Sequence, residues 1–149
     1  MASPTPGPGL SLQIKRTFQA PREKVWAAWT ERKGLERWMC RDVPTHDPKY
    51  TELDVRPGGR YAIEITQPDG VIYRGSGTFL EVKPPEKLVF TWAWKSTPER
   101  ESLVTVLLKP DGDGTLLTVT HEQFFDEDAR DRHQFGWNGA LDKMEKMFT

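Results

Sequence analysis

The sequence predicts one domain of the α+β class, in which an antiparallel sheet packs against a long C-terminal helix. Three observations carry this prediction. A helical segment with three tryptophans lies early in the chain, over residues 20–38. Short segments with alternating apolar residues follow it, separated by Pro and Gly turns, as is typical of antiparallel strands. Residues 126–148 then repeat apolar side chains at helical spacing. Strands followed by a separate helix indicate an α+β fold.

The composition is that of an ordinary single domain. The 149 residues carry 21 basic and 22 acidic side chains, and the formal net charge is -1. We therefore expect no nucleic acid partner. No apolar run reaches the roughly 20 residues that cross a bilayer, so we expect no membrane span. Residues 1–9 predict a disordered tail and residues 10–149 one domain.

The same sequence predicts a cytoplasmic protein. Its first residues, MASPTPGPG, contain neither the basic segment nor the apolar segment of a secretory signal. Its single cysteine, Cys40, cannot form an intramolecular disulfide, which suits a reducing compartment. With no neighbouring His, Cys40 is interpreted as a small buried apolar residue rather than a nucleophile.

Residues 10–18 predict the first strand, because apolar and polar side chains alternate along them. Arg16 is the charged residue on the apolar side. A buried charge needs a partner, so we expect an ion pair, with Glu64 or Glu122, or an exposed strand end. The alternative is that Arg16 recognises an anionic or carbonyl-bearing ligand.

A pair of short helices is predicted next, ending near Cys40. Pro21 suits a first helical turn, and Gly34 is expected to end or bend the first helix. The apolar side chains at helical spacing are Val25, Trp26 and Trp29 in the first helix and Leu35 and Trp38 in the second. We interpret Trp26 and Trp29 as structural and Trp38 as a residue at the mouth of a cavity.

Residues 44–48, which include His46, predict a polar connection without periodicity. Five strands should follow, and the residues that indicate them are 61–65, 71–82, 88–94, 102–109 and 117–121. Turns are expected at 68–70, 84–85 and 111–114. Residues 111–114 resemble a calcium loop, but the distal Glu is missing, so a hairpin is expected.

Residues 126–148 predict the C-terminal helix. Acidic residues in the first turn and lysines near the end match the helix dipole. Its apolar stripe comprises His133, Trp137, Ala140, Leu141, Met144 and Phe148. Gly136 and Gly139 interrupt the pattern, and we expect a backbone or bulky side chain to lie close to them.

Several short segments make this sequence resemble the family of proteins homologous to the activator of Hsp90 ATPase (AHSA1-like). The matching segments are Ala20-Pro21, Val25-Trp26, Ala28-Trp29-Thr30, Leu35, Trp38, Arg56-Pro57-Gly58-Gly59, Gly77, Phe79, Glu81, Pro84-Pro85-Glu86, Leu88, Thr118–His121 and Gly136-Trp137. The resemblance covers nearly all of the chain after residue 10. It implies the helix-grip (Bet v 1-like) fold of the START superfamily, in which a curved antiparallel sheet wraps around a long C-terminal helix and two short helices follow the first strand.

The resemblance also implies a cavity between sheet and helix, which relatives use for lipids, polyketides, hormones or toxic metabolites. The candidate cavity residues here are Trp38, Tyr61, Ile63, Tyr73, Trp92, Trp94, His121, His133, Trp137 and Leu141. The same aromatic side chains could instead fill a solid core, and the sequence leaves both alternatives open.

Catalytic and metal-binding motifs are scarce. Residues 75–77 do not form a nucleophile elbow and lie in a strand pattern where glycines allow curvature or a bulge. The three histidines are far apart in sequence, so we expect no metal and no cofactor. His121 shares a strand face with Leu117 and Val119 and is interpreted as a hydrogen-bonded core histidine, the alternatives being a polar handle for a ligand or a proton carrier.

The function expected from these residues and this resemblance is binding of an apolar or aromatic small molecule, with a stress or resistance role. The alternatives are an Hsp90-type chaperone-associated protein and an enzyme of the polyketide cyclase or hydrolase type, with His121 and a nearby acid as base and acid. In the eukaryotic activator a separate Hsp90-binding domain precedes this one, and residues 1–9 leave no room for it. We expect a monomer or a homodimer.

Overall fold

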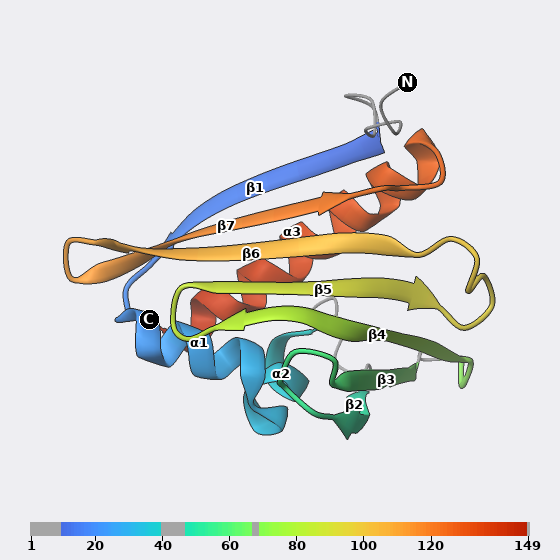
Figure 1. Cartoon of the computed structure of the whole chain (residues 1–149), viewed down its shortest axis with the longest axis horizontal. Coiled ribbons are helices and arrows are strands. Elements are labelled where there is room, and N and C mark those ends of the chain that lie inside the picture. Colours follow the sequence, from blue (N-terminus) through green and yellow to red (C-terminus); the bar gives the residue numbers. More distant parts are fainter. Residues whose placement is uncertain (1–9, 40–46, 67–68, 149) are drawn as a thin grey trace.

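A seven-stranded antiparallel sheet and three helices make up the part of the chain that the computed structural model describes, residues 10–39, 47–66 and 69–148. The strands are β1 (Ser11–Phe18), β2 (Asp47–Leu53), β3 (Arg60–Thr66), β4 (Ile72–Lys83), β5 (Lys87–Trp94), β6 (Ser102–Asp111) and β7 (Gly114–Glu122). The helices are α1 (Arg22–Thr30), α2 (Arg32–Trp38) and α3 (Glu127–Met147). The sheet order is β1-β7-β6-β5-β4-β3-β2, and α3 runs diagonally across one face (Figure 1). The predicted helix-grip fold is confirmed.

Strand β2 corrects the sequence prediction of a polar connection over residues 44–48. Residues 47–53 pair with β3, and the register shifts between Tyr50 and Glu52. That irregularity breaks the alternation of side chains, and β2 is an edge strand with one neighbour, so its sequence shows no clear period. Pro44, His46 and Cys40 lie outside the described residues.

The helix pair forms as predicted, but Gly34 does not end the first helix. Pro21 is the N-cap of α1, and the chain leaves helical geometry at Glu31 (φ -103°, ψ 137°). Gly34 lies within α2, where an added Cβ would be 2.9 Å from the Cα of Ala28. Its missing side chain therefore lets the two helices pack closely.

Arg16 forms an ion pair, although with other partners than Glu64 or Glu122. Its Nη1 lies 2.6 Å from Oδ1 of Asp142 on α3, and its Nη2 donates to the backbone oxygen of Asn138 at 3.3 Å. Glu64 pairs with Arg74 instead. These contacts fasten β1 to α3 across the sheet face.

Helix α3 begins and packs as its sequence predicts. The Asp126 side chain accepts a hydrogen bond from the Ala129 N–H, as an N-cap does. Ala140, Leu141 and Met144 are buried against the sheet. Gly136 differs from the expectation, because an added Cβ there would meet nothing within 4 Å. No large neighbour explains this glycine.

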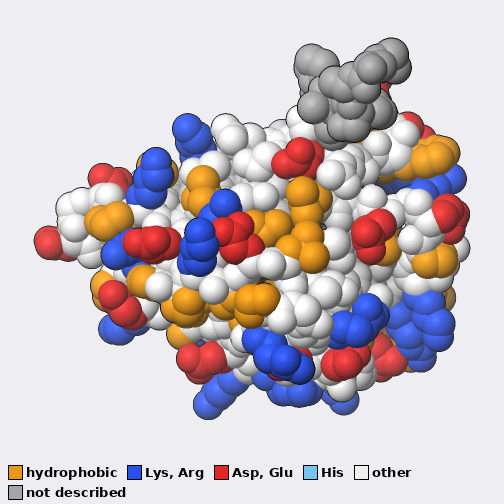
Figure 2. Space-filling view, viewed as in Figure 1, with side chains coloured by type: hydrophobic (Ala, Val, Ile, Leu, Met, Phe, Trp, Pro, Cys, Tyr) orange, Lys and Arg blue, Asp and Glu red, His pale blue; other side chains and the backbone are white. Residues whose placement is uncertain are grey.

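The predicted hairpin at residues 111–114 is confirmed. Residues 111–114 form the β6–β7 hairpin, with Gly112 at φ +59°. Acidic and basic side chains are interspersed on the face shown in Figure 2, with hydrophobic side chains between them. Among the described helices, none is long and apolar enough to span a membrane.

Candidate ligand-binding site

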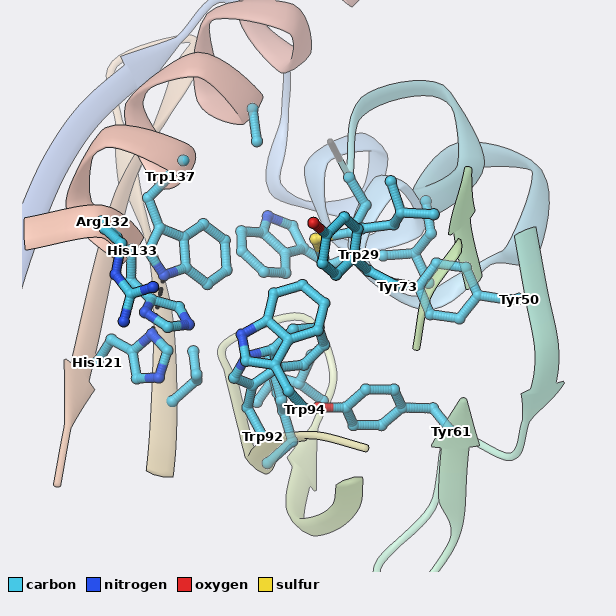
Figure 3. Close-up of a pocket in the computed structure, with 18 of the residues that line it drawn as sticks. Trp29, Tyr50, Tyr61, Tyr73, Trp92, Trp94, His121, Arg132, His133 and Trp137 are labelled. Atoms are coloured by element: carbon cyan, nitrogen blue, oxygen red, sulfur yellow. Dashed lines mark hydrogen bonds between the residues drawn. The ribbon is translucent and has the colours of Figure 1, made fainter. Parts of the chain in front are cut away.

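A cavity of about 690 Å³ lies between the sheet, α3 and the α1–α2 pair. Strands β2 to β5 supply most of the sheet side of its wall, and α3 supplies the opposite side. Figure 3 shows His121, His133 and Trp137 on one side of this space and Tyr50 and Tyr61 on the other. The volume lies within the range of small-molecule sites, roughly 300–1,000 Å³. The sequence left open whether the inward-facing aromatic side chains enclose a cavity or fill a solid core. The structure has a cavity there.

The wall is built from stacked aromatic rings. Trp92 lies parallel to Tyr61, with ring centroids 6.3 Å apart and an angle of 11° between planes. Trp94 meets Trp92 edge to face at 4.9 Å, and Trp29 lies 5.8 Å from Trp137. Every second residue of β5 points to the same face, so this strand alone presents two tryptophans to the cavity.

Gly75 on β4 makes room for one of these rings. An added Cβ at this position would come within 2.5 Å of Cη2 of Trp92. The glycines of residues 75–77 predict curvature or a bulge, and the register shift of β4 lies instead between Phe79 and Glu81. The glycine therefore serves the close approach of an aromatic side chain.

Tyr61 uses its hydroxyl group within the protein. The Tyr61 hydroxyl donates to the backbone oxygen of Thr91. Burial raises the pKa of Tyr61 well above its ordinary value of 10.0, and burial together with Glu36 raises the pKa of Tyr50. Both side chains therefore stay protonated and uncharged at neutral pH.

His121 lies in the middle of a series of hydrogen bonds that runs from Trp137 to the backbone oxygen of Trp92. Its Nδ1 accepts from Nε1–H of Trp137 at 3.0 Å, because an indole nitrogen can only donate. Its Nε2–H therefore donates to Oγ of Ser102 at 2.7 Å, and that hydroxyl donates to the Trp92 backbone oxygen at 3.1 Å. Burial, with a smaller effect of His133, lowers the pKa of His121 well below 6.5. The ring is neutral and both nitrogens are occupied.

His133 is held differently. Its Nδ1 lies 2.7 Å from the Ala129 backbone oxygen, which only accepts, so Nδ1 carries the hydrogen. Its Nε2 is buried and has no hydrogen-bond partner among the described residues. Burial lowers the pKa of His133 below its ordinary value of 6.5, the hydrogen bond to the Ala129 backbone oxygen partly opposes this, and Arg132 lowers it further, so the ring is neutral at pH 7. The Nε2 atom of His133 therefore has an unused lone pair that is covered by the surrounding protein.

Seven of the ten predicted residues line the cavity: Tyr61, Tyr73, Trp92, Trp94, His121, His133 and Trp137. That they bind a ligand stays a prediction. Trp38, Ile63 and Leu141 are almost completely buried and are not among the lining residues. The prediction of Trp38 at the cavity mouth is wrong. Its Nε1 donates to the Ala28 backbone oxygen at 2.7 Å, which fixes the ring between α1 and α2.

Several residues of the cavity wall are not among those predicted from the sequence. Trp29, interpreted as structural, packs against Trp38 at 4.5 Å and also lines the cavity. Tyr50 was missed because β2 was not predicted. Phe90 shares its strand face with Trp92 and Trp94, so the alternation of β5 could have identified it.

The cavity opens between the start of β4 and the first half of α3. Tyr73 and Phe135 line it and are also 48% and 66% exposed, so they stand at its rim. Gly136 lies beside them and leaves open space where other residues would place a side chain. A small molecule could enter at this rim without passing through the sheet.

A metal centre is not present among the described residues. His121 and His133 come together, with ring centroids 5.3 Å apart, although they are distant in sequence. No group of three or more His, Cys, Asp or Glu side chains in the described part of the chain could hold a metal ion.

Comparisons with known proteins agree with this architecture. The family model described as Activator of Hsp90 ATPase homolog 1-like protein matches residues 19–149. The crystal structure of protein CV1439 from Chromobacterium violaceum has a TM-score of 0.85 at 23% identity, covering 93% of this chain and 96% of that one. The AHSA1 protein SPO3351 from Silicibacter pomeroyi has a TM-score of 0.79 at 26% identity, covering 92% and 96%.

A third solved structure is more similar in sequence. CalU16 from Micromonospora echinospora is 32% identical, with a TM-score of 0.70, and the match covers 93% of this chain and 74% of that one. No curated protein matches this sequence significantly.

Proposed function

This chain belongs to the family of Activator of Hsp90 ATPase homolog 1-like proteins, and we propose that it binds a small apolar or aromatic molecule in the cavity between sheet and α3. The observation that carries the proposal is a cavity of about 690 Å³ walled mainly by aromatic rings. Each square ångström of apolar surface that a ligand removes from water contributes roughly 25 cal/mol. An aromatic wall of this size therefore supports binding by burial alone.

The hydrogen bonds of His121 favour binding over catalysis, because both of its ring nitrogens are engaged. A general base must have a free lone pair within reach of the proton that it removes. The Nδ1 lone pair of His121 already accepts from Trp137, and its Nε2–H already donates to Ser102. These contacts support a structural role for His121, as the sequence interpretation favoured, and argue against the cyclase or hydrolase alternative that made it the base.

The finer aspects of function stay proposals. An Hsp90-type chaperone is the alternative partner, and it would use the outer surface of the protein rather than the cavity. A pull-down with Hsp90 and an assay of its ATPase rate test that alternative, and stimulation of the ATPase would support it. A role in stress or resistance, a cytoplasmic location and a monomeric or dimeric state are likewise predictions.

Two measurements test the binding proposal. Native mass spectrometry of the freshly purified protein should show a bound small molecule, or, after its removal, apolar aromatic compounds should quench tryptophan fluorescence saturably. The substitution Ala140→Phe introduces a bulky group on the cavity wall and should weaken binding at least tenfold. Ala93→Phe is the matched control, because residue 93 alternates with Trp92 and Trp94 and faces away from the cavity.

Two results of these measurements would contradict the binding proposal. Equal loss of affinity in both variants would place the binding site elsewhere, and the absence of any saturable binding by the wild type would refute the proposal. Circular dichroism of each variant reports whether the fold is retained.

A further inference from the structure

Gly136 lies in the middle of α3, and the packing of the described residues gives no reason for a glycine there. Glycine favours a helix less than every other residue except proline, so a helical glycine usually serves a close contact or an unusual backbone angle. Gly136 is not among the glycines with positive φ, and a Cβ built on it would meet nothing within 4 Å. Gly34 and Gly75, in contrast, make room for a backbone and for an indole ring.

The space at Gly136 belongs to the cavity, because this residue lies on the inner face of α3. Residues three and four positions apart share one face of a helix. The α3 residues that line the cavity at this spacing are His133, Gly136, Trp137 and Ala140. Figure 3 shows His133 and Trp137 extending from α3 toward the space beside Trp94. A side chain at position 136 would therefore point into the same space.

Further along α3 the inner face is packed. Leu141 and Met144 are completely buried and are not among the residues that line the cavity. Protein interiors are close-packed, so an inward position of a helix normally has neighbours in contact. Gly136 has none within 4 Å of an added Cβ. A molecule in the cavity can therefore approach the backbone of α3 closely at this residue, as ligands do at glycines.

Gly136 also lies next to the opening of the cavity. Tyr73 on β4 and Phe135 on α3 stand at the rim beside it. A side chain at position 136 would narrow the space between α3 and β4 there. The width available to a ligand at this place thus depends directly on residue 136.

The volume of the cavity indicates a ligand larger than one aromatic ring. A dry apolar cavity of about 150 Å³ is large enough to bind benzene. The cavity here has a volume of about 690 Å³. A single ring would leave most of it empty, whereas several fused rings would cover more of the aromatic wall and gain more from burial.

We propose that Gly136 is a specificity-determining residue for the size of the ligand: a molecule of several fused rings lies with one edge against the α3 backbone at Gly136, where any other residue would place a side chain. This inference rests on the proposed function and adds the size class of the ligand. A single-ring molecule fits into the cavity without reaching Gly136.

Fluorescence titration with three probes tests the inference. The probes are 4-ethylphenol with one ring, 2-naphthol with two fused rings and 1-hydroxypyrene with four, and each has one hydroxyl group. We expect the affinity of the wild type to rise at least tenfold from the first probe to the last, because the larger molecules bury more apolar surface.

Gly136→Leu places a side chain in the proposed contact. We expect this variant to bind 1-hydroxypyrene at least tenfold more weakly than the wild type, roughly the effect of overfilling a packed site, and to bind 4-ethylphenol within about twofold of it. Gly136→Ala should give a smaller loss for 1-hydroxypyrene. Gln134→Leu is the matched control, because it introduces the same side chain at an exposed position of α3, and it should bind all three probes as the wild type does.

Thermal denaturation separates a role in binding from a role in packing. Since leucine and alanine favour a helix more than glycine and the position is open, both Gly136 variants should melt about 1–4 °C above the wild type. A lower melting temperature, or failure to fold, would show that the glycine serves the packing of the protein and would overturn the inference.

The titrations also distinguish this inference from the proposed function. If Gly136→Leu binds 1-hydroxypyrene as tightly as the wild type, or loses affinity equally for all three probes, the size inference is wrong and binding in the cavity stands. If no probe binds the wild type, both are wrong.

Discussion

At the scale of single residues, hydrogen-bond partners decide what the two histidines of the cavity wall can do. His121 is buried, His133 is partly buried, both rings are neutral, and their centroids lie 5.3 Å apart. His121 accepts a hydrogen bond at Nδ1 and donates one from Nε2, whereas Nε2 of His133 has no partner in the part of the chain that the structure describes. The sequence identifies His121 as inward-facing, but it gives no sign that His133 is the histidine with a free acceptor.

Replacing His121 should destabilise the protein. In His121→Phe the N–H of Trp137 loses its acceptor, and an unmatched buried donor costs about 1–3 kcal/mol. Urea denaturation should show a loss of that size. The double variant His121→Phe/Trp137→Phe should recover part of it, because no indole N–H then remains unmatched. Full stability of His121→Phe would contradict the hydrogen-bond chain.

The stability of the fold should depend on pH below about 6.5. Folding lowers the pKa of His121 and of His133, so the unfolded chain binds protons first as the pH falls. Stability is therefore complete above pH 6.5 and decreases below it, by up to about 1.4 kcal/mol per pH unit for each histidine. Urea denaturation between pH 7.5 and 5 measures this slope.

His133→Phe should make that slope smaller, because one of the two titrating groups is gone. The prediction fails if stability is constant, or rises, as the pH falls from 7 to 5.

At the scale of elements, periodicity predicts best where an element is regular and packed on one face. The alternation of β5 and the three-and-four spacing of α3 identified the inward-facing Trp92, Trp94 and Trp137. Strand β2 was not predicted, because the register shift at this sheet edge breaks the alternation of its side chains. Trp38 was misplaced because its burial depends on the angle between α1 and α2, which a helical period does not contain.

Two helical glycines should respond to substitution in opposite ways. Gly136→Ala should stabilise α3 by about 0.5–1 kcal/mol, since the new Cβ meets nothing within 4 Å and alanine favours the helix. Gly34→Ala should destabilise the protein, because its Cβ would lie 2.9 Å from the backbone of Ala28. Thermal and urea denaturation compare the two variants. An equal effect of both would refute the close packing of α1 on α2.

At the scale of the whole molecule, the fold is predictable and the cavity is not. The order of strands and helices in the sequence leads to the helix-grip architecture, which the structure confirms. The aromatic residues that face inward would be the same in a filled core. Whether they leave a space depends on how far α3 and the α1–α2 pair stand from the sheet, a distance set by many side chains together.

The position of the six tryptophans provides the most direct test that this cavity binds a ligand. Trp29, Trp92, Trp94 and Trp137 line it, whereas Trp26 and Trp38 are not among the lining residues. A ¹H–¹⁵N spectrum of the indole N–H groups during titration with 2-naphthol reads all six at once. Ligand binding in the cavity predicts saturable shifts of the first four signals at one molecule per chain, with Trp26 and Trp38 nearly unmoved. No shifts, or shifts of similar size in all six, would contradict it.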